Sequence, residues 1–274
     1  METCAVQMPR TMETVRAVTK MIEDLQIPVY DEKHNSGIVK TLAVRESWST
    51  GEVQLTFITN SAKLPHKREL LERIEKELPA VVSVMQNVNP GDTPLVWGDK
   101  MIHLAGKDSI LESLMGLDFK LSARSFLQLN PEQTEVLYEE ASKALELDQD
   151  DTLIDAYAGI GTIGLSLASR VKAVRGMEII PEAVADANEN AKLNNITNAK
   201  YEVGKAEEVL PRWQKEGLNF DALVVDPPRT GLDDQLIKQI LKVKPRKFAY
   251  VSCGMASLAR NLRRLTSVYH VDYI

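Results

Sequence analysis

Short apolar runs alternate with amphipathic stretches from about residue 121 to the end of the chain. The runs have the length of strands, and the stretches between them space their apolar residues three or four apart, as helices do. Strands separated by helices predict right-handed crossovers and a mostly parallel, doubly wound sheet. We therefore expect an α/β, Rossmann-like domain over residues 121–274. Its strands are expected at 152–156, 173–178, 199–203, 221–225, 247–252 and 268–274, and its helices at 131–145, 162–170, 181–193, 206–216, 233–241 and 256–265.

The first 120 residues follow a different pattern. Apolar runs at 38–44 and 53–59 are joined through a turn at 49–51, which indicates an antiparallel pair. The pattern predicts a separate, smaller α+β domain over residues 1–120, ahead of the Rossmann-like domain. Its other elements are expected to be helices at 11–25 and 66–78 and strands at 81–88, 100–105 and 119–122.

The composition is that of an ordinary soluble globular protein. The chain has 274 residues, 44% of them hydrophobic, and a formal net charge of −6. No apolar stretch reaches the length of a membrane span, and the amino end lacks the apolar core of a signal peptide. We therefore expect a cytoplasmic protein. The sequence is silent on oligomeric state, for which a monomer is the default expectation.

The negative net charge disfavours a generally basic nucleic-acid binder, but it leaves room for local contacts to phosphates. Three basic clusters, at 63–68, 242–247 and 260–264, are candidates for such contacts. The alternative is that each cluster is a solvated surface, as most runs of charge are.

Cys4 and Cys253 are the two cysteines of the chain. Two cysteines are too few for a disulfide framework or a cysteine-based metal site, and we expect no metal. Cys253 follows the apolar run 247–252, and open α/β sheets bind ligands at the carboxyl ends of their strands. Cys253 is therefore a candidate nucleophile. The alternative is a buried structural thiol, because free cysteine is among the most buried residue types.

The segment Gly159-Ile160-Gly161-Thr162-Ile163-Gly164 has the G-x-G-x-x-G spacing of a nucleotide-binding turn. Glu178 ends the next strand, where a carboxylate meets ribose hydroxyls. The spacing alone fits NAD or S-adenosylmethionine. Asp155 favours S-adenosylmethionine, because a carboxylate at the strand end repels a pyrophosphate and attracts the methionine ammonium. The alternative is that the glycines only permit a tight turn.

The segment Asp226-Pro227-Pro228-Arg229 follows the strand expected at 221–225. Two prolines fix an extended backbone, which leaves the Asp226 carboxylate pointing into the expected site. Methylases of exocyclic amino groups carry an aromatic residue after a similar Pro-Pro pair. Arg229 stands there instead, so we expect a different role in base recognition. The alternative is a rigid start to a loop.

A cysteine beside S-adenosylmethionine fits one chemistry in particular. Carbon 5 of a pyrimidine is too weak a nucleophile to take a methyl group until a thiolate adds to carbon 6 and creates an enolate. The helix expected at 256–265 begins just after Cys253, and its amino end and Arg260 favour the thiolate form.

Several segments together carry a resemblance to one family. They are Phe126-Leu127-Gln128-Leu129-Asn130, the stretch from Asp155 to Thr162, Glu178, Asp226 to Arg229, and Ser252-Cys253 with Leu258-Ala259-Arg260. In these segments the chain resembles the RNA uracil-5 methyltransferases, in particular the bacterial 23S rRNA (uracil-5-)-methyltransferases, with the tRNA (uracil-54) enzyme as a relative.

The resemblance implies the roles of individual residues. It implies that the cofactor is S-adenosylmethionine and that Cys253 is the catalytic nucleophile, which adds to carbon 6 of a flipped uridine before carbon 5 is methylated. It implies an RNA substrate, most like 23S rRNA, and an RNA-contacting role for residues 1–120. The expected cofactor-binding residues are Gln128, Tyr157, Gly159, Gly161, Glu178 and Asp226, and the expected substrate-binding residues are Phe126, Gln128, Asp226 and Arg229.

The chain also departs from the family. Ala158 stands where the family usually has Cys or Ser, and Gly254 stands where it usually has Asn. The family's amino-terminal RNA-binding barrel and cysteine cluster have no counterpart. Its general base is a glutamate after the nucleophile, whereas Asp272 is the only carboxylate side chain after Cys253. We therefore expect a fragment, cut at both ends, that binds cofactor but turns over RNA poorly.

Other functions stay open. One is a uracil-5 methyltransferase that acts on tRNA. Another is a small-molecule or protein methyltransferase with an incidental cysteine, which the segment 126–130 and Arg229 disfavour. A third is a catalytically incomplete RNA-binding module.

Overall fold

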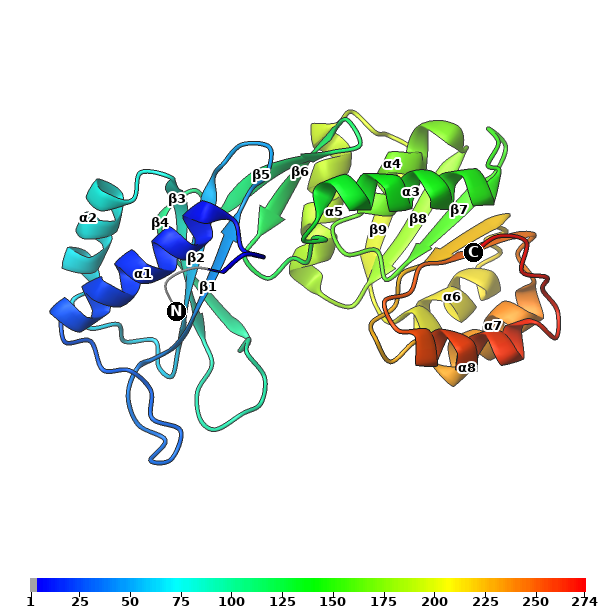
Figure 1. Cartoon of the computed structure of the whole chain (residues 1–274). Helices are drawn as coiled ribbons and strands as arrows, with labels where there is room; N and C mark the ends of the chain where they lie inside the picture. The colour runs from blue at the N-terminus through cyan, green and yellow to red at the C-terminus, as the bar shows by residue number, and fades with distance from the viewer. Residues whose placement is uncertain (1–3) are drawn as a thin grey trace. The chain divides into compact units, whose positions relative to one another are not determined.

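The computed structural model describes residues 4–274 and divides into two compact units (Figure 1). Unit 1 comprises Met1–Ser113 and Lys120–Arg124, and unit 2 comprises Leu114–Phe119 and Ser125–Ile274. The chain therefore passes between the units three times, at 113/114, 119/120 and 124/125.

Unit 1 is a mixed sheet with two helices packed on it. Its strands are β1 (Val39–Glu46), β2 (Val53–Thr59), β3 (Val81–Val88) and β4 (Lys100–Gly106), in the order β1-β2-β3-β4. The β1–β2 pair is antiparallel, as the turn at 49–51 predicts, whereas β2 and β3 are parallel and are linked through α2 (Lys67–Glu77). Helices α1 (Pro9–Asp24) and α2 bury Met21 and Leu70 against Phe57 of β2.

A two-stranded hairpin of β5 (Ser109–Leu114) and β6 (Leu117–Ser122) follows. Its turn residues, Met115 and Gly116, both have positive φ, at 54° and 73°. Two left-handed residues in succession give the twist that a tight hairpin requires. The sequence pattern predicted only the end of β6, because a methionine rarely takes the first left-handed position.

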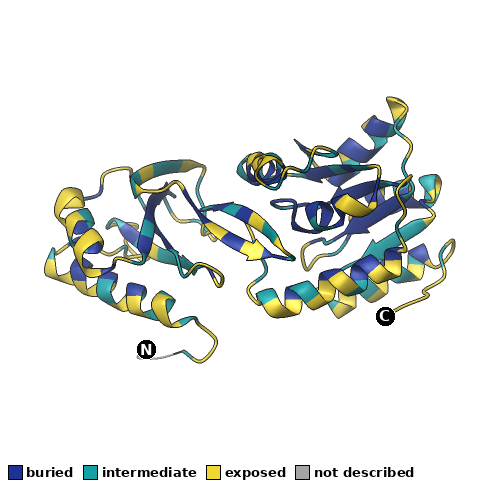
Figure 2. Cartoon of the chain, turned by 90° about the horizontal axis from the view of Figure 1, so that it is seen from above, coloured by how far each residue is buried: buried dark blue, intermediate teal, exposed yellow. Residues whose placement is uncertain are grey.

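Unit 2 is a parallel, five-stranded sheet in the order β11-β10-β7-β8-β9. The strands are β7 (Thr152–Ala156), β8 (Ala173–Glu178), β9 (Ala199–Val203), β10 (Ala222–Val225) and β11 (Lys247–Tyr250). The expected α/β, Rossmann-like fold is therefore confirmed. Figure 2 shows the central strands of this sheet as buried, which agrees with the continuous apolar sequence of β10.

Helices cover both faces of this sheet (Figure 1). One face carries α3 (Pro131–Leu145), α4 (Thr162–Leu167) and α5 (Pro181–Leu193), and the other carries α6 (Ala206–Lys215), α7 (Asp234–Val243) and α8 (Met255–Leu265). The chain runs outward from β7 to β9 and then returns to the other side of β7 as β10. The strand order thus reverses between β7 and β10, which is the place where such sheets bind ligands.

Helix boundaries follow local signals in the sequence. The Asn130 side chain accepts a hydrogen bond from the Gln133 backbone N–H at 3.2 Å, and Pro131 occupies the first turn of α3. An amide cap followed by proline is a strong start for a helix. The helix expected at 162–170 is in fact α4 followed by a 3₁₀ turn, Ala168–Arg170.

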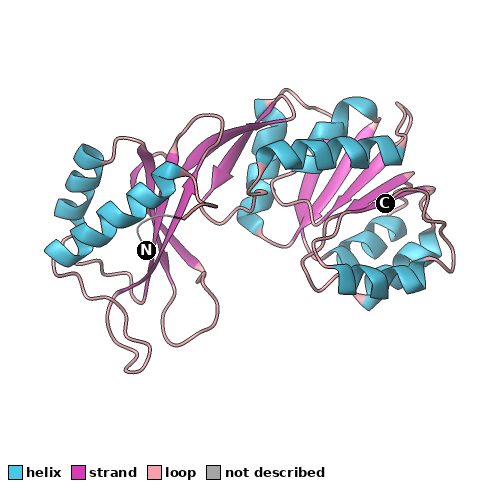
Figure 3. Ribbon diagram, viewed as in Figure 1, coloured by secondary structure: helices cyan, strands magenta, loops and turns pink. Residues whose placement is uncertain are grey.

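The strand expected at 268–274 is wrong. The segment after α8 has no regular structure (Figure 3). The backbone N–H groups of Val268 and Tyr269 both donate to the Leu265 carbonyl, which caps α8. Tyr269 then packs its ring on Phe248, with ring centres 5.5 Å apart. Apolar residues that contact the sheet through side chains give the same sequence pattern as a strand.

Candidate active site

The turn after β7 has an unusual backbone. Tyr157, Gly159 and Gly161 have φ angles of 64°, 56° and 84°. Glycine takes this left-handed region at no steric cost, but tyrosine does not, so the conformation of Tyr157 is strained. Two backbone hydrogen bonds hold the turn. The Ala158 N–H donates to the Met177 carbonyl at 3.0 Å, and the Gly161 N–H donates to the Ala158 carbonyl at 2.8 Å.

The two glycines differ in what surrounds them. A side-chain carbon at Gly161 would lie 3.0 Å from the Tyr201 ring, whereas one at Gly159 would meet no atom within 4 Å. Gly161 is therefore required by packing as well as by backbone angle, and Gly159 leaves its backbone open to close approach.

Glu178 ends β8 beside this turn. Its carboxylate accepts one hydrogen bond from the Gly159 N–H at 3.1 Å and another from the Ile180 N–H at 2.9 Å. The two bonds use different oxygens and fix the plane of the carboxylate. Each oxygen keeps capacity for a further donor.

Asp155 lies beneath the turn instead of facing solvent. Its side chain is 1% exposed and accepts the Gly164 N–H at 2.9 Å. Burial is the largest cause that raises the pKa of Asp155 to about 7; the hydrogen bond from Gly164 opposes this shift, and the charges of Asp226 and Glu178 add to it. The Asp155 carboxyl therefore lies below the turn, hydrogen-bonded to the Gly164 N–H.

Asp226 follows β10 and meets Gln128, which precedes α3. The Gln128 Nε2 donates to the Asp226 carboxylate at 3.4 Å. Burial raises the pKa of Asp226, and the hydrogen bond from Gln128 opposes this shift. The Asp226 N–H donates to the Ala156 carbonyl at 3.4 Å, which places Asp226 beside the start of the β7 turn.

Tyr157 packs against the apolar cluster under α6 and α7. Burial raises the pKa of its phenol well above the ordinary value, so Tyr157 stays neutral at physiological pH. Two other predicted residues, Phe126 and Arg229, are exposed, with 64% of Phe126 accessible to solvent.

Cys253 lies in the loop between β11 and α8 and is exposed, so the alternative of a buried structural thiol is wrong. β11 pairs with β10 in parallel, and the Val251 N–H continues the ladder to the Val225 carbonyl at 2.9 Å. Because Asp226 directly follows Val225, the Cys253 and Asp226 loops leave the sheet at the same edge. The expected helper Arg260 donates to the Thr230 carbonyl at 2.5 Å.

Sequence reasoning missed Asn261 and Tyr250. Asn261 is buried, and it accepts hydrogen bonds from the Tyr250 hydroxyl at 2.8 Å and from the Leu232 N–H at 2.9 Å. A signal was present, because Ser257, Asn261 and Leu265 are spaced four apart on the buried stripe of α8. An amide on such a stripe must find polar partners.

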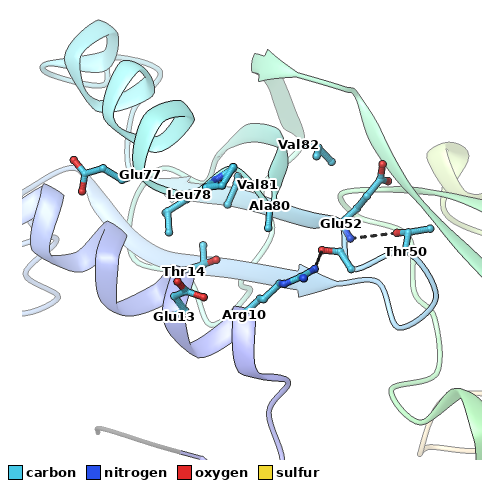
Figure 4. A pocket seen from close by; sticks show the side chains of 12 residues that line it. Arg10, Glu13, Thr14, Thr50, Glu52, Glu77, Leu78, Ala80, Val81 and Val82 are labelled. Carbon is cyan, nitrogen blue, oxygen red and sulfur yellow. Dashed lines mark hydrogen bonds between the residues drawn. The ribbon is translucent and has the colours of Figure 1, made fainter.

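Two pockets lie away from these residues. A pocket of about 480 Å³ in unit 1 is bordered by Arg10, which donates to the Gly51 carbonyl, and by Glu52 (Figure 4). A pocket of about 490 Å³ in unit 2 lies at the end of α5, around Asn195. Neither is lined by a residue expected at the active site.

The comparisons with known proteins bear on this constellation. A family model described as tRNA (Uracil-5-)-methyltransferase matches residues 107–274, a span that includes the Gly159 turn, Asp226 and Cys253. The chain belongs to this tRNA (uracil-5-)-methyltransferase family. The resemblance drawn from the sequence motifs is thereby confirmed at the level of the family.

Curated relatives of this chain include proteins named as uncharacterized RNA methyltransferases. One from Lactiplantibacillus plantarum is 60% identical over 272 residues, 99% of this chain and 56% of that protein. One from Listeria monocytogenes is 54% identical over 273 residues, 100% of this chain and 60% of that protein. The chain thus spans 56–60% of the length of these relatives.

A solved structure from the same family is also similar. The Pyrococcus abyssi tRNA (uracil-54, C5)-methyltransferase, in complex with S-adenosyl-L-homocysteine, matches with a TM-score of 0.78 and 30% identity, over 96% of this chain and 62% of that one. Among residues 4–274, every helix is too short or too polar to cross a lipid bilayer. Over the same residues, no group of three or more His, Cys, Asp or Glu side chains could hold a metal ion.

Proposed function

We propose that the protein carrying this chain methylates carbon 5 of a uridine in RNA, with S-adenosylmethionine as methyl donor and Cys253 as nucleophile. One observation carries the proposal. An exposed cysteine and a carboxylate-lined glycine turn stand at the same edge of one sheet, on the consecutive strands β11, β10 and β7. A thiol beside such a turn has a specific use in pyrimidine methylation.

The residues around the β7 turn fit S-adenosylmethionine. Glu178 offers two fixed carboxylate oxygens to a pair of ribose hydroxyls, and the open backbone at Gly159 admits a ligand closely. Asp155 and Asp226 add negative charge that suits a sulfonium and an ammonium and would repel the pyrophosphate of NAD. When bound, the cofactor would supply an electrophilic methyl group. The S-adenosyl-L-homocysteine in the Pyrococcus abyssi relative supports this choice.

The chain's own residues are proposed to have separate roles in the reaction. The Cys253 thiolate adds to carbon 6 of the uracil, which turns carbon 5 into a nucleophile for the methyl group. A base removes the carbon 5 proton, and Cys253 leaves with its electron pair to restore the ring. Asp226, fixed by Gln128, and the exposed Phe126 and Arg229 are proposed to position the flipped base.

The proposed substrate is 23S rRNA, because the motifs in this chain are most like those of the rRNA enzymes. The alternative is tRNA, which is the substrate printed for the Pyrococcus abyssi relative. Unit 1 is proposed to contact the RNA. We further propose that the protein acts in the cytoplasm.

The test is methyl transfer by the intact protein that carries this chain. Radiolabelled cofactor is incubated with 23S rRNA transcripts, with tRNA transcripts and with a protein mixture, and the products are digested to nucleosides. We expect label in 5-methyluridine from 23S rRNA. Label confined to tRNA would change the substrate, label in protein would contradict the proposal, and RNA binding with no label would favour the incomplete RNA-binding module.

A further inference from the structure

Asn261 holds two separate loops at once. It lies on α8, is 2% exposed, and its Oδ1 accepts the Leu232 N–H at 2.9 Å and the Tyr250 hydroxyl at 2.8 Å. Leu232 lies in the loop that begins with Asp226, and Tyr250 ends β11, three residues before Cys253. One buried amide oxygen therefore joins the Asp226 loop, the Cys253 strand and α8.

Close backbone packing supports the same connection. Gly231 has φ 80°, and a side-chain carbon there would lie 2.4 Å from the Asn261 Oδ1. The loop can therefore reach Asn261 only because residue 231 has no side chain. Arg260, next to Asn261, donates to the Thr230 carbonyl at 2.5 Å.

The Cys253 loop itself touches the Asp226 loop at a second glycine. Gly254 has an ordinary extended backbone, yet a side-chain carbon there would lie 3.0 Å from the Arg229 carbonyl oxygen and 2.8 Å from the Ser257 Oγ. The absence of a side chain at Gly254 therefore lets the two loops approach. We define residues 226–232 together with 250–261 as the loop clamp.

We propose that Asn261 is a positioning residue for methyl transfer, which sets the Cys253 loop against the Asp226 loop through its shared Oδ1. This inference rests on the proposed function. A misplacement of about 1 Å between reacting groups costs on the order of 10²-fold in rate. Loss of the shared acceptor therefore slows thiol addition more than it weakens cofactor binding, because the Gly159 turn after β7 and Glu178 of β8 lie outside the loop clamp.

A purely structural amide would behave differently. Its loss would lower stability, cofactor binding and adduct formation together. A variant that restores only the acceptor atom would not selectively restore adduct formation. Asn261→Asp keeps the acceptor oxygen for Leu232 and Tyr250 and loses only the Nδ2 donor to the Leu232 carbonyl at 3.5 Å, whereas Asn261→Leu removes acceptor and donor at similar volume. Tyr250→Phe removes one donor and keeps the aromatic packing on Phe248, 6.4 Å between ring centres.

The matched control is Asn198→Ala. The Asn198 side chain donates to the carbonyls of Ala168 at 2.8 Å and Val171 at 3.0 Å, ahead of β9 and far along the sheet from Cys253. Its loss removes a comparable pair of hydrogen bonds without touching the loop clamp.

The experiment uses the intact protein that carries this chain and RNA substituted with 5-fluorouridine, which traps the covalent adduct. We expect adduct formation about 10- to 100-fold slower in Asn261→Leu, near wild type in Asn261→Asp and Asn198→Ala, and intermediate in Tyr250→Phe. The dissociation constant for S-adenosylmethionine changes much less than the rate of adduct formation in all four. Hydrogen exchange rises at 226–232 and 250–256 together in Asn261→Leu, and not at 155–164.

Four results overturn the inference. They are adduct formation at the wild-type rate in Asn261→Leu, equal slowing in Asn261→Asp, equal slowing in Asn198→Ala, or unchanged exchange in the loop clamp. A wild-type protein that forms no adduct with any RNA instead overturns the proposed function, and the positioning role of Asn261 with it. Adduct formation by the wild-type protein distinguishes the two failures.

Discussion

The Glu178 carboxylate accepts the Gly159 N–H at 3.1 Å, so the end of β8 is tied to the turn after β7 by a side chain expected to hold the cofactor. We expect Glu178→Ala to weaken S-adenosylmethionine binding by about 1.5–3 kcal/mol, the range for hydrogen bonds to charged groups. Isothermal titration calorimetry measures this change. Glu208→Ala, on the exposed side of α6, is the control and should bind normally. Wild-type affinity in Glu178→Ala would show that the cofactor is misplaced.

Cys253 is expected to form the covalent adduct, and Cys4 is expected to be irrelevant. Fluorine at carbon 5 blocks the final elimination, so RNA containing 5-fluorouridine should shift the protein on a denaturing gel when cofactor is present. The shift should vanish in Cys253→Ala and persist in Cys4→Ala. An adduct that survives in Cys253→Ala assigns the nucleophile elsewhere.

Cofactor affinity is expected to rise with pH between 6 and 8. The pKa of Asp155 is raised to about 7 by burial and by its acidic neighbours, so the free protein is largely protonated there at pH 6. A bound cation favours the carboxylate, and one coupled proton changes affinity by at most about tenfold per pH unit. Asp155→Asn should bind more weakly at pH 8 and with a flatter pH dependence. Calorimetry at pH 6, 7 and 8 tests this, and parallel curves for both proteins would contradict it.

Asp151 is expected to stabilise unit 2. Its side chain has no exposed surface and pairs with Lys247 at 2.7 Å and with Arg246. Asp151→Asn should lower the free energy of unfolding by about 1.5–3 kcal/mol at pH 7, as measured by urea denaturation. Asp150→Asn, on the exposed side of the same turn, should change it by less than about 0.5 kcal/mol.

The pH dependence of this contribution has a definite sign. Burial would raise the pKa of Asp151, but the hydrogen bonds from Lys247 and from the Asp148 N–H outweigh it and hold the pKa below its ordinary value. The stabilisation is therefore present above the unfolded pKa of about 3.9 and is lost as the pH falls through the lower folded pKa. The wild-type protein and Asp151→Asn should converge in stability below that range. A constant difference down to pH 2 would disprove the assignment.

Much of unit 2 was predictable because its local signals agree with its packing. The helices Pro131–Leu145 and Pro181–Leu193 begin at prolines and have the expected limits. The hairpin strand Ser109–Leu114 was missed because its turn uses a methionine in a left-handed conformation. The false strand at 268–274 arose because Tyr269 buries its ring without joining the ladder.

Site residues that belong to a sequence motif could be predicted. Side chains whose orientation or partners depend on packing could not. Glu178 and Asp226 lie at strand ends, as their motifs indicate. The sequence placed Asp155 at a ligand, whereas its carboxylate is turned under the glycine loop toward Gly164. Asn261 carries no motif of its own, and its importance depends on contacts with Leu232, 29 residues away.

The basic clusters show the same limit. Arg246 and Lys247 are engaged with Asp151, and Arg264 is engaged with Asp234. Part of two clusters is thus engaged in ion pairs within unit 2, a detail that depends on which carboxylates the fold brings close.

The chain crosses between its two units three times, and this limits how the units can be exchanged by recombination during evolution. Leu114–Phe119 belongs to unit 2 although unit 1 encloses it in the sequence. Within this stretch the Asp118 N–H donates to the Asn194 side chain at 2.9 Å, and that side chain donates back to the Asp118 carbonyl at 2.7 Å. A genetic recombination event at any single codon between residues 113 and 125 would leave one of the two units incomplete. Gene fusion end to end therefore cannot exchange either unit cleanly, and we expect the two to have descended together.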